Sequence, residues 1–554
     1  MKKFSQNTVR YYRDFGEFIT EIGSHYRGRR ALSWFTRKKE EQSRTYDELI
    51  RDVEGLRESL CARKLAGKHI ALVGENCYYW LVTYLACTLC GAAAVCIDPE
   101  QPDEVIRAML LQADVSAVFA STGCSGVCGP VLEKRPEMMG IFSLNSQTEQ
   151  EEMAVGRLCR EGSRLLEQCG GKTGFPVELD PEAPAAIVFT SGTTGESKPV
   201  MLSQRALLNN ASESNCYVDG GIKAFSALPF CHAYGMTCAV LATFARGAEL
   251  CFNGNLKTAI RDMRLSGAYS MLAVPLMGEA LHSQIWLEAE RHGEAEKLRG
   301  LLKKMKFRGR FGMKKPCRAL EELRRKHFGT LRVILFGGAH MNEKCAEEFR
   351  HLGLTVLEGY GITECGPLVS VNGAEWNRQG SVGRILPSCQ VKIEDDEILV
   401  RGSMLMSGYY GMPDESAAAV RDGWFHTGDL GKLDKDGFLY ITGRRKNLVV
   451  FKNGKKISPE GLEMRLRQIP LVKDVMVYGA ESGKAADDVK LAASIYPDPE
   501  QAGMMTSYEI LEELQQAVDQ INDGLPLYQQ IQMVNIREQR FEKTSLQKIK
   551  RHTV

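Results

Sequence analysis

Short apolar runs alternate with longer, partly polar stretches through the first two-thirds of the chain. The runs hold four to six residues and lie at 69–73, 117–120, 186–190, 331–336 and 354–357. Such runs, bounded by polar turns, are typical of strands buried on both faces of a parallel sheet. The helical stretches between them predict an α/β domain in which helices cover parallel sheets.

The pattern changes after about residue 380. Shorter strands and turns follow there, and Asp436-Gly437 is placed to form a hairpin turn. Beyond residue 446 the order becomes strand, strand, helix, strand, which is typical of an α+β unit. We therefore predict a large N-terminal domain over residues 1–445, with a β-rich lobe at about 380–445, and a small C-terminal domain over 446–554.

One uncharged stretch, residues 77–97, is about long enough to span a bilayer. Gly91 ends its helical half, however, and residues 92–97 form an apolar run closed by Asp98-Pro99. We expect a helix followed by a buried strand, and no transmembrane span. No apolar run follows the N-terminal lysines, so we also expect no secretory signal.

Composition narrows the class of protein further. The chain has 554 residues and a formal net charge of +2, so no long-range field favours nucleic acid as a partner. Its 17 cysteines show neither the spacing of small disulfide loops nor that of zinc ligands. Scattered thiols in a large chain predict a reducing, cytoplasmic location.

The most informative segment is TSGTTGESKP at residues 190–199, which directly follows an apolar run. Ligands bind at this end of the strands in α/β sheets. Two glycines let backbone N–H groups converge, and hydroxyls and Lys198 add donors and positive charge suited to a polyphosphate. The loop is not of the Walker A type, because Ser197 stands where that type requires glycine. We expect phosphate contacts from Thr190, Ser191, Gly192, Thr193, Thr194, Gly195 and Lys198.

This loop resembles the signature of the adenylate-forming, or AMP-binding, superfamily. Further motifs follow in that family's order: LPFCHAYG at 228–235, FGGA at 336–339, EGYGITECGP at 358–367, GWFHTGDL at 423–430 and KTSLQKIKR at 543–551. The resemblance covers about residues 15–551 and is greatest to AMP-forming long-chain fatty acyl-CoA synthetases. The chain departs from the family's usual residues at Ser197, Pro199, Asn447 and Gln547.

The resemblance implies an ATP site. Tyr360 offers its ring to adenine, and Thr363 offers a hydroxyl to phosphate. Glu364 offers a carboxylate to Mg²⁺, which prefers hard oxygen ligands and shares them with substrate phosphates. Asp429 accepts hydrogen bonds from the ribose hydroxyls. The remaining implied ATP contacts are Glu358, Gly359, Gly361 and Arg444.

The resemblance also implies residues for the acid and for CoA. His232, Gly338 and Ala339 line the acyl pocket. Lys446 is the hinge of a mobile C-terminal domain, and Gly454 lies on the path of CoA. Lys548 is the catalytic lysine, with Thr363 and His232 as further catalytic residues. Lys550 is an alternative for the catalytic lysine, but the spacing of the motif selects Lys548.

The implied activity is ATP-dependent activation of a carboxylic acid. The acid, a medium- or long-chain fatty acid, becomes an acyl adenylate and then a CoA thioester. One alternative is an enzyme that loads an acyl carrier protein. Another is a degenerate nucleotide-binding regulatory protein, which retention of Lys548, Glu364 and Asp429 disfavours. The basic residues 285–327 are either a solvated helical insertion or a contact for lipid headgroups or CoA phosphates, so peripheral membrane contact stays open.

Overall fold

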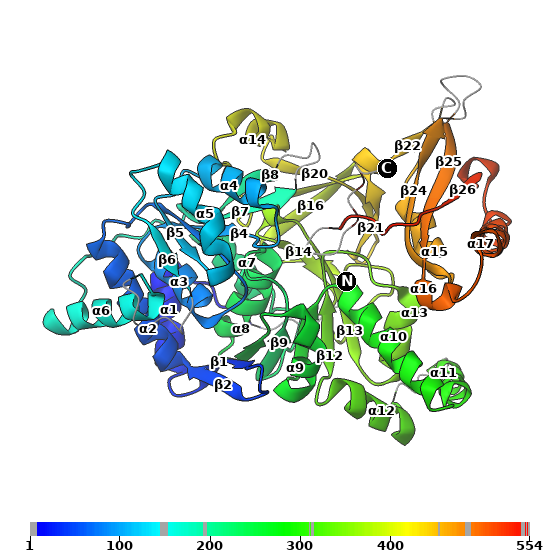
Figure 1. Cartoon of the computed structure of the whole chain (residues 1–554), viewed down its shortest axis with the longest axis horizontal. Coiled ribbons are helices and arrows are strands. Elements are labelled where there is room, and N and C mark those ends of the chain that lie inside the picture. Colours follow the sequence, from blue (N-terminus) through cyan, green and yellow to red (C-terminus); the bar gives the residue numbers. More distant parts are fainter. Residues whose placement is uncertain are drawn as a thin grey trace. The chain divides into compact units, whose positions relative to one another are not determined.

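The computed structural model describes residues 8–144, 153–191, 197–309, 311, 315–451, 455–481, 489–543, 549 and 551. The chain forms two compact units (Figure 1). The first comprises Met1–Gln390 with Val400–Phe425, and the second comprises Val391–Leu399 with His426–Val554. The domain boundary at 445/446 stays a prediction.

A nine-stranded sheet organises one half of the first unit, in the order β15-β14-β13-β12-β11-β9-β10-β1-β2. Its middle strands are parallel, as the apolar runs at 331–336 and 354–357 predicted for two of them, β12 and β13. They are β10 (Glu249–Phe252), β9 (Lys223–Ser226), β11 (Ser270–Ala273), β12 (Val333–Phe336) and β13 (Thr355–Gly361). The edges are antiparallel: β1 (Arg30–Phe35) with β2 (Glu41–Thr45), and β14 (Leu368–Val371) with β13 and with β15 (Arg384–Ile385).

A seven-stranded sheet forms the other half of the first unit, in the order β18-β8-β7-β4-β3-β5-β6, where β6 is Ile141–Ser143. The strands β3 (His69–Val73), β4 (Ala93–Ile97) and β5 (Ala117–Ala120) are parallel and buried. The uncharged stretch folds as expected, with α3 (Tyr78–Leu89), a turn at Gly91 with φ 67°, and then β4. In the described part of the chain, every helix is too short or too polar to cross a membrane.

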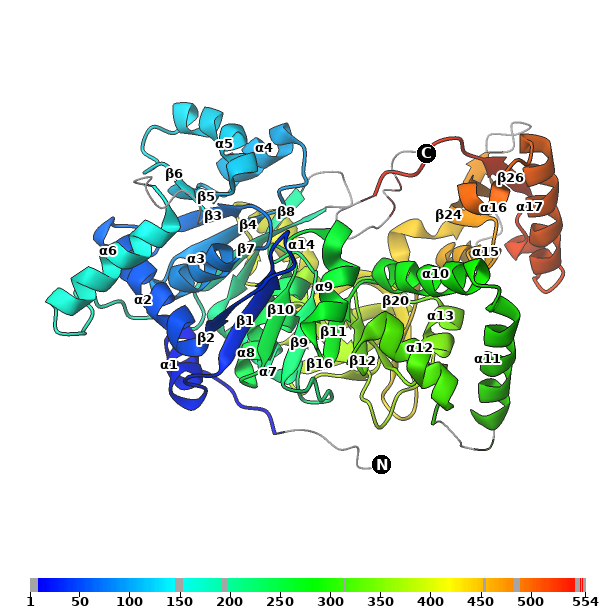
Figure 2. The same ribbon diagram turned by 60° about the horizontal axis from the view of Figure 1, so that its bottom comes forward.

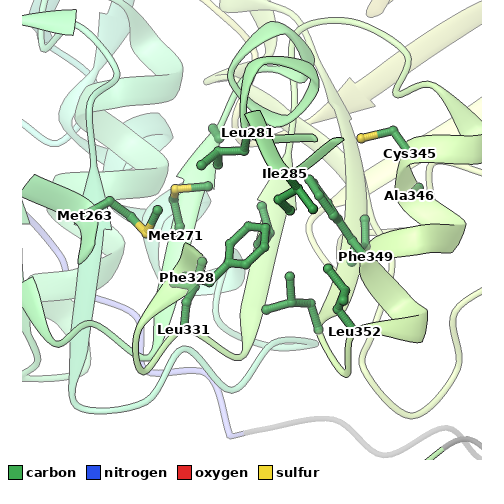
Figure 3. Packing of buried hydrophobic residues seen from close by; sticks show 14 of the residues in the cluster. Met263, Met271, Leu281, Ile285, Phe328, Leu331, Cys345, Ala346, Phe349 and Leu352 are labelled. Atoms are coloured by element: carbon green, nitrogen blue, oxygen red, sulfur yellow. The ribbon is translucent and has the colours of Figure 1, made fainter. Parts of the chain in front are cut away.

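Helices pack against the nine-stranded sheet and bury a continuous apolar core (Figure 3). Ile285 of α10 (Pro275–Arg291), Phe328 of α12 (Arg318–Phe328) and Phe349 of α13 (Glu343–His351) belong with Met271 of β11 to this core. Burial of each such side chain contributes about 1.5–3 kcal/mol. This core fixes β12 and β13, whose carboxyl ends carry the FGGA and EGYG motifs.

Shorter strands follow, as the change of pattern near residue 380 predicted. Between β16 (Cys389–Glu394) and β17 (Glu397–Gly402), Asp395 and Asp396 take positive φ values of 49° and 63°. Between β20 (Trp424–Leu433) and β21 (Leu439–Arg444), Gly437 takes a φ of 81°. The second pair is antiparallel, which confirms the hairpin predicted at Asp436-Gly437.

The second unit has its own small core. The strand β25 (Val489–Pro497) pairs antiparallel with β24 (Val472–Glu481) and parallel with β26 (Met533–Ile536). The helix α17 (Ser507–Asn522) begins at a capping box of Thr506 and Glu509 and buries Leu514 and Val518. The predicted order of strand, strand, helix and strand is found from Val472 onwards, but the short strands β22 (Val449–Val450) and β23 (Lys456–Ile457) and the helix α15 (Glu460–Leu466) precede it and were not predicted.

Candidate active site

The predicted phosphate loop joins two antiparallel strands of the first unit. Thr190 is the last residue of β7 (Pro184–Ser191) whose side chain the structure describes. It pairs with Lys198 of the neighbouring strand, β8 (Ser197–Ser203). The loop is shorter at its exit than predicted, because Ser197 to Pro199 already belong to β8. Gly192, Thr193, Thr194, Gly195 and the side chain of Ser191 lie outside the described residues.

Tyr409 connects this strand pair to the predicted magnesium ligand. It lies in β18 (Gly408–Tyr409), opposite Val200 of β8, and Lys198 Nζ is 4.9 Å from the centre of its ring. Its hydroxyl donates a hydrogen bond of 3.0 Å to Glu364 Oε1. Burial and the neighbouring Glu364 raise the pKa of Tyr409, which keeps the hydroxyl protonated as a donor. The structure thus brings Lys198, a predicted phosphate-binding residue, and Glu364, the predicted metal ligand, to the same side chain, Tyr409.

Glu364 suits a magnesium ion chemically. It is buried in the short helix η4 (Thr363–Cys365), and its backbone carbonyl accepts the Met406 N–H at 2.8 Å. Among the described residues, no group of three or more His, Cys, Asp and Glu could hold a metal ion. That is compatible with Mg²⁺, because this ion commonly takes one or two carboxylates and completes its shell with water and substrate phosphates. Thr363 is half-buried beside Glu364.

The backbone of the EGYG motif is tightly enclosed. A Cβ at Gly361 would lie 2.4 Å from the carbonyl oxygen of Pro367, so no side chain fits there. Tyr360 is buried and faces Ser370 of β14. Glu358 is buried as well, which raises its pKa, and it accepts the Met341 N–H at 3.4 Å. The Nδ1 atom of His340 lies 3.4 Å from Glu358 Oε2.

The FGGA turn follows β12 and needs glycine for two reasons. Gly338 has a φ of 85°, which disfavours any residue with a side chain. A Cβ at Gly337 would lie 2.9 Å from the ring of Tyr234, whose hydroxyl donates to the Leu335 carbonyl at 3.2 Å. Tyr234 begins a π-helical turn, η2 (Tyr234–Leu241), a form that is frequent at functional sites. Ala339 directly follows this turn.

His232, the predicted acyl-pocket histidine, lies just before that π-helical turn. Its Nε2 atom is 3.7 Å from Asp98 Oδ2. Asp98 follows β4 and is buried. The structure therefore places a carboxylate beside this imidazole at the carboxyl end of a parallel strand, where α/β sheets bind ligands.

In the second unit, Asp429 and Arg444 are cross-strand partners in β20 and β21. Arg444 Nε lies 2.7 Å from Asp429 Oδ1, with Asp429 buried and the Arg444 side chain 44% exposed. Burial, and then the charge of Arg444, lower the pKa of Lys446. Asn447, which departs from the family's usual aspartate, donates a hydrogen bond of 2.5 Å to Glu460 Oε1. An aspartate there would place two carboxylates together, so the departure fits this neighbour.

The C-terminal motif is anchored on both sides of the predicted catalytic lysine. Lys543 Nζ lies 2.7 Å from Asp474 Oδ1, and Arg551 Nη2 lies 2.7 Å from both carboxylate oxygens of Glu463. Arg551 and Lys446 also line one open pocket of about 460 Å³. Lys548, its rival Lys550, and Gly454 lie outside the described residues.

Comparison with known proteins identifies the family of the chain. A model of the AMP-binding enzyme family matches residues 20–410, more than half of the chain. A second, for the C-terminal domain of AMP-binding enzymes, matches residues 446–554. The chain belongs to the AMP-binding enzyme family.

Two relatives of this AMP-binding enzyme are long-chain-fatty-acid–CoA ligases. One, FadD15 of Mycobacterium bovis, is 27% identical over 432 residues, which cover 75% of this chain and 71% of that protein. The other, from Escherichia coli O157:H7, is 26% identical over 495 residues, which cover 82% and 80%. A solved structure of o-succinylbenzoate–CoA synthetase from Bacillus subtilis has the same fold, with a TM-score of 0.73, 21% identity, and coverage of 99% of this chain and 98% of that one.

These findings confirm the predicted α/β fold and the family. The AMP-binding enzyme is an acid–thiol ligase of the adenylate-forming acyl- or aryl-CoA class. Three neighbours of its motifs escaped sequence reasoning: Tyr409, His340 and Asp98. Asp98 and His340 had a detectable signal, because each follows an apolar run at the carboxyl end of a predicted strand, His340 directly after the FGGA motif.

Proposed function

We propose that this ligase activates a medium- or long-chain fatty acid, first to an acyl adenylate and then to an acyl-CoA thioester. The observation that carries the nucleotide part is that Lys198 lies over the ring of Tyr409 while Glu364 accepts a hydrogen bond from the hydroxyl of the same residue. It supports a site in which a cation and a carboxylate are held ready for a triphosphate. The names of the two ligases from Mycobacterium bovis and Escherichia coli support a fatty acid as substrate.

In the first half-reaction, a carboxylate oxygen of the acid attacks the α-phosphorus of ATP, and pyrophosphate leaves. Both reactants are anions, so electrostatic positioning supplies most of the catalysis. Lys548 neutralises the carboxylate and the α-phosphate, while Lys198, Thr190 and the loop that follows bind the leaving pyrophosphate. Mg²⁺, when bound, neutralises phosphate charge, and Glu364 is the protein oxygen that would hold it.

Other residues position the nucleotide and the acid. Asp429, oriented by Arg444, accepts hydrogen bonds from the ribose hydroxyls, and Tyr360 contacts adenine. The turn with Gly338 lets the backbone approach the acyl group closely, and His232 lines the acyl pocket. The role of Asp98 is to orient the His232 imidazole.

In the second half-reaction, the thiol of CoA attacks the acyl carbon and AMP leaves with the mixed-anhydride oxygen. Lys446 acts as the hinge of the C-terminal domain, and Gly454 lets the pantetheine arm pass. Exchange of the C-terminal domain between two positions would let each half-reaction have its own arrangement of groups.

A panel of acids in a pyrophosphate-release assay tests this function. The panel runs from acetate through octanoate to stearate and includes o-succinylbenzoate and indoleacetate, each with and without CoA. We expect the highest kcat/KM with an acid of medium or long chain and an acyl-CoA product. A preference for an aromatic acid would contradict the fatty-acid proposal. Acyl transfer to an acyl carrier protein but not to CoA would contradict the proposed acceptor.

A further inference from the structure

The helix α11 (Ala295–Gly309) lies on the outside of the first unit, beyond α10 and α13 (Figure 2). Residues 295–328 contain thirteen lysines and arginines but only three acidic residues. The whole chain carries a formal net charge of only +2, so the remainder is acidic on balance. Positive charge is therefore concentrated in this one segment, which is a sequence signal for an anionic surface as partner.

The inner face of α11 explains how the helix is held. Leu298, Leu302 and Met305, spaced three or four residues apart, are buried in the core under the nine-stranded sheet. At about 100° per residue, Phe307 lies on the opposite side of the helix, between the directions of Lys303 and Lys304. All three of these side chains are exposed, Phe307 to 61%.

A second phenylalanine extends this outer face. Phe311 is 67% exposed, and its ring centre is 5.2 Å from that of Phe307 in an edge-to-face contact. Two adjacent exposed phenylalanines form an apolar patch without a structural role in the core. Among the described residues Lys303 and Lys304 form no ion pair, whereas Lys306, nearer the inner face, pairs with Glu347 at 3.1 Å. Lys303, Lys304, Phe307 and Phe311 are called the outer patch below.

We propose that the outer patch docks this ligase on an anionic lipid bilayer. The two phenylalanines would enter the boundary between headgroups and acyl chains, and the lysines would contact lipid phosphates. An acidic protein would satisfy the lysines, but it would also need an apolar pocket that matches two adjacent rings; a bilayer supplies both environments anywhere on its surface. The proposal does not depend on which acid the enzyme activates.

Vesicle co-sedimentation of the full-length protein tests the proposal. The vesicles are of phosphatidylcholine alone or of phosphatidylcholine with a third of phosphatidylglycerol. We expect binding to the anionic vesicles and its decrease at high salt, since each lysine near such a surface contributes about fivefold in partitioning. Lys303→Glu with Lys304→Glu should lower partitioning by at least about twenty-five-fold. Phe307→Ser with Phe311→Ser should also weaken it, and this loss should persist at low salt.

Matched controls separate the outer patch from general charge and hydrophobicity. Lys134→Glu with Lys172→Glu makes the same change of net charge at exposed sites elsewhere, and Phe175→Ser removes a partly exposed ring elsewhere. Both controls should bind vesicles as the wild type does. The proposal is wrong if wild-type protein does not bind anionic vesicles, or if outer-patch and control variants bind equally. It is also wrong if the outer-patch variants lose binding only to an acidic acyl carrier protein.

Discussion

Glu364 in the first unit and Asp429 in the second are both buried carboxylates, but their partners differ. Glu364 accepts a hydrogen bond from the hydroxyl of Tyr409, whereas Asp429 forms an ion pair with Arg444. A hydroxyl donates a neutral hydrogen bond to a carboxylate, while a guanidinium donates a charge-assisted one. The hydrogen bond from Tyr409 orients Glu364, the predicted Mg²⁺ ligand. The ion pair with Arg444 orients the oxygens of Asp429, the predicted acceptor of the ribose hydroxyls.

The largest effect is expected at the predicted catalytic lysine of the second unit. Lys548→Ala should lower the rate of adenylation at least about a hundredfold, because the variant loses the cation proposed to neutralise the carboxylate and the α-phosphate together. Thioester formation from supplied acyl adenylate should be spared. Lys550→Ala is the matched control and should retain both half-reactions. If Lys550→Ala lost adenylation and Lys548→Ala did not, the assignment of the catalytic lysine would be wrong.

Glu364→Gln tests whether the buried carboxylate of the first unit is the metal ligand. The variant keeps an acceptor for Tyr409 but removes the charge, so adenylation should fall about a hundredfold and respond only weakly to added Mg²⁺. Glu394→Gln, at an exposed carboxylate, should have no effect. Steady-state pyrophosphate release over a range of Mg²⁺ concentrations measures the difference. A Glu364→Gln enzyme with the wild-type dependence on Mg²⁺ would show that Glu364 is not the metal ligand.

Asp429→Asn tests the second unit in the same way and should have a smaller effect. The variant loses both the charge-assisted hydrogen bonds to ribose and the ion pair with Arg444. Loss of one such bond costs about 1.5–3 kcal/mol, so the Kd for ATP should rise by roughly ten- to a hundredfold. Isothermal titration with ATP, compared with binding of the acid, measures this. If the affinities for ATP and for the acid fell equally, with an unchanged Tm, the result would argue against a ribose contact.

The smallest effect is expected from Asn447→Asp, which sharpens the description of the second unit. The substitution replaces a hydrogen-bond donor to Glu460 with a second carboxylate. The half-buried pair should destabilise the unit by up to about 1 kcal/mol, and salt should reduce the loss. Thermal unfolding at low and high ionic strength, with Asn447→Ala as control, checks both points. If the Asn447→Asp variant were as stable as the wild type at low salt, the neighbouring Glu460 would not explain why asparagine stands at position 447.

The local sequence predicted the strands and the motifs better than it predicted the distant residues that contact them in the fold. The runs at His69–Val73 and Ala117–Ala120 match β3 and β5 at both ends, because apolar residues dominate each run and the pattern changes directly outside it. Tyr409 was missed because its contacts arise from the pairing of β18 with β8, about two hundred residues away in the chain. Pro199 was assigned to a loop, yet it lies in β8, where its carbonyl accepts the Tyr410 N–H at 2.8 Å. Long-range pairing of this kind leaves no local pattern.

The central claim is that the chain forms an acyl adenylate before CoA takes part. Exchange of labelled pyrophosphate into ATP tests it most directly, because exchange requires a reversible adenylation step that releases pyrophosphate. With a fatty acid, ATP and Mg²⁺ but no CoA, we predict exchange that depends strictly on the acid and is lost in Lys548→Ala. Exchange that occurs only when CoA is present, or turnover that yields ADP and phosphate instead of AMP and pyrophosphate, would contradict the account.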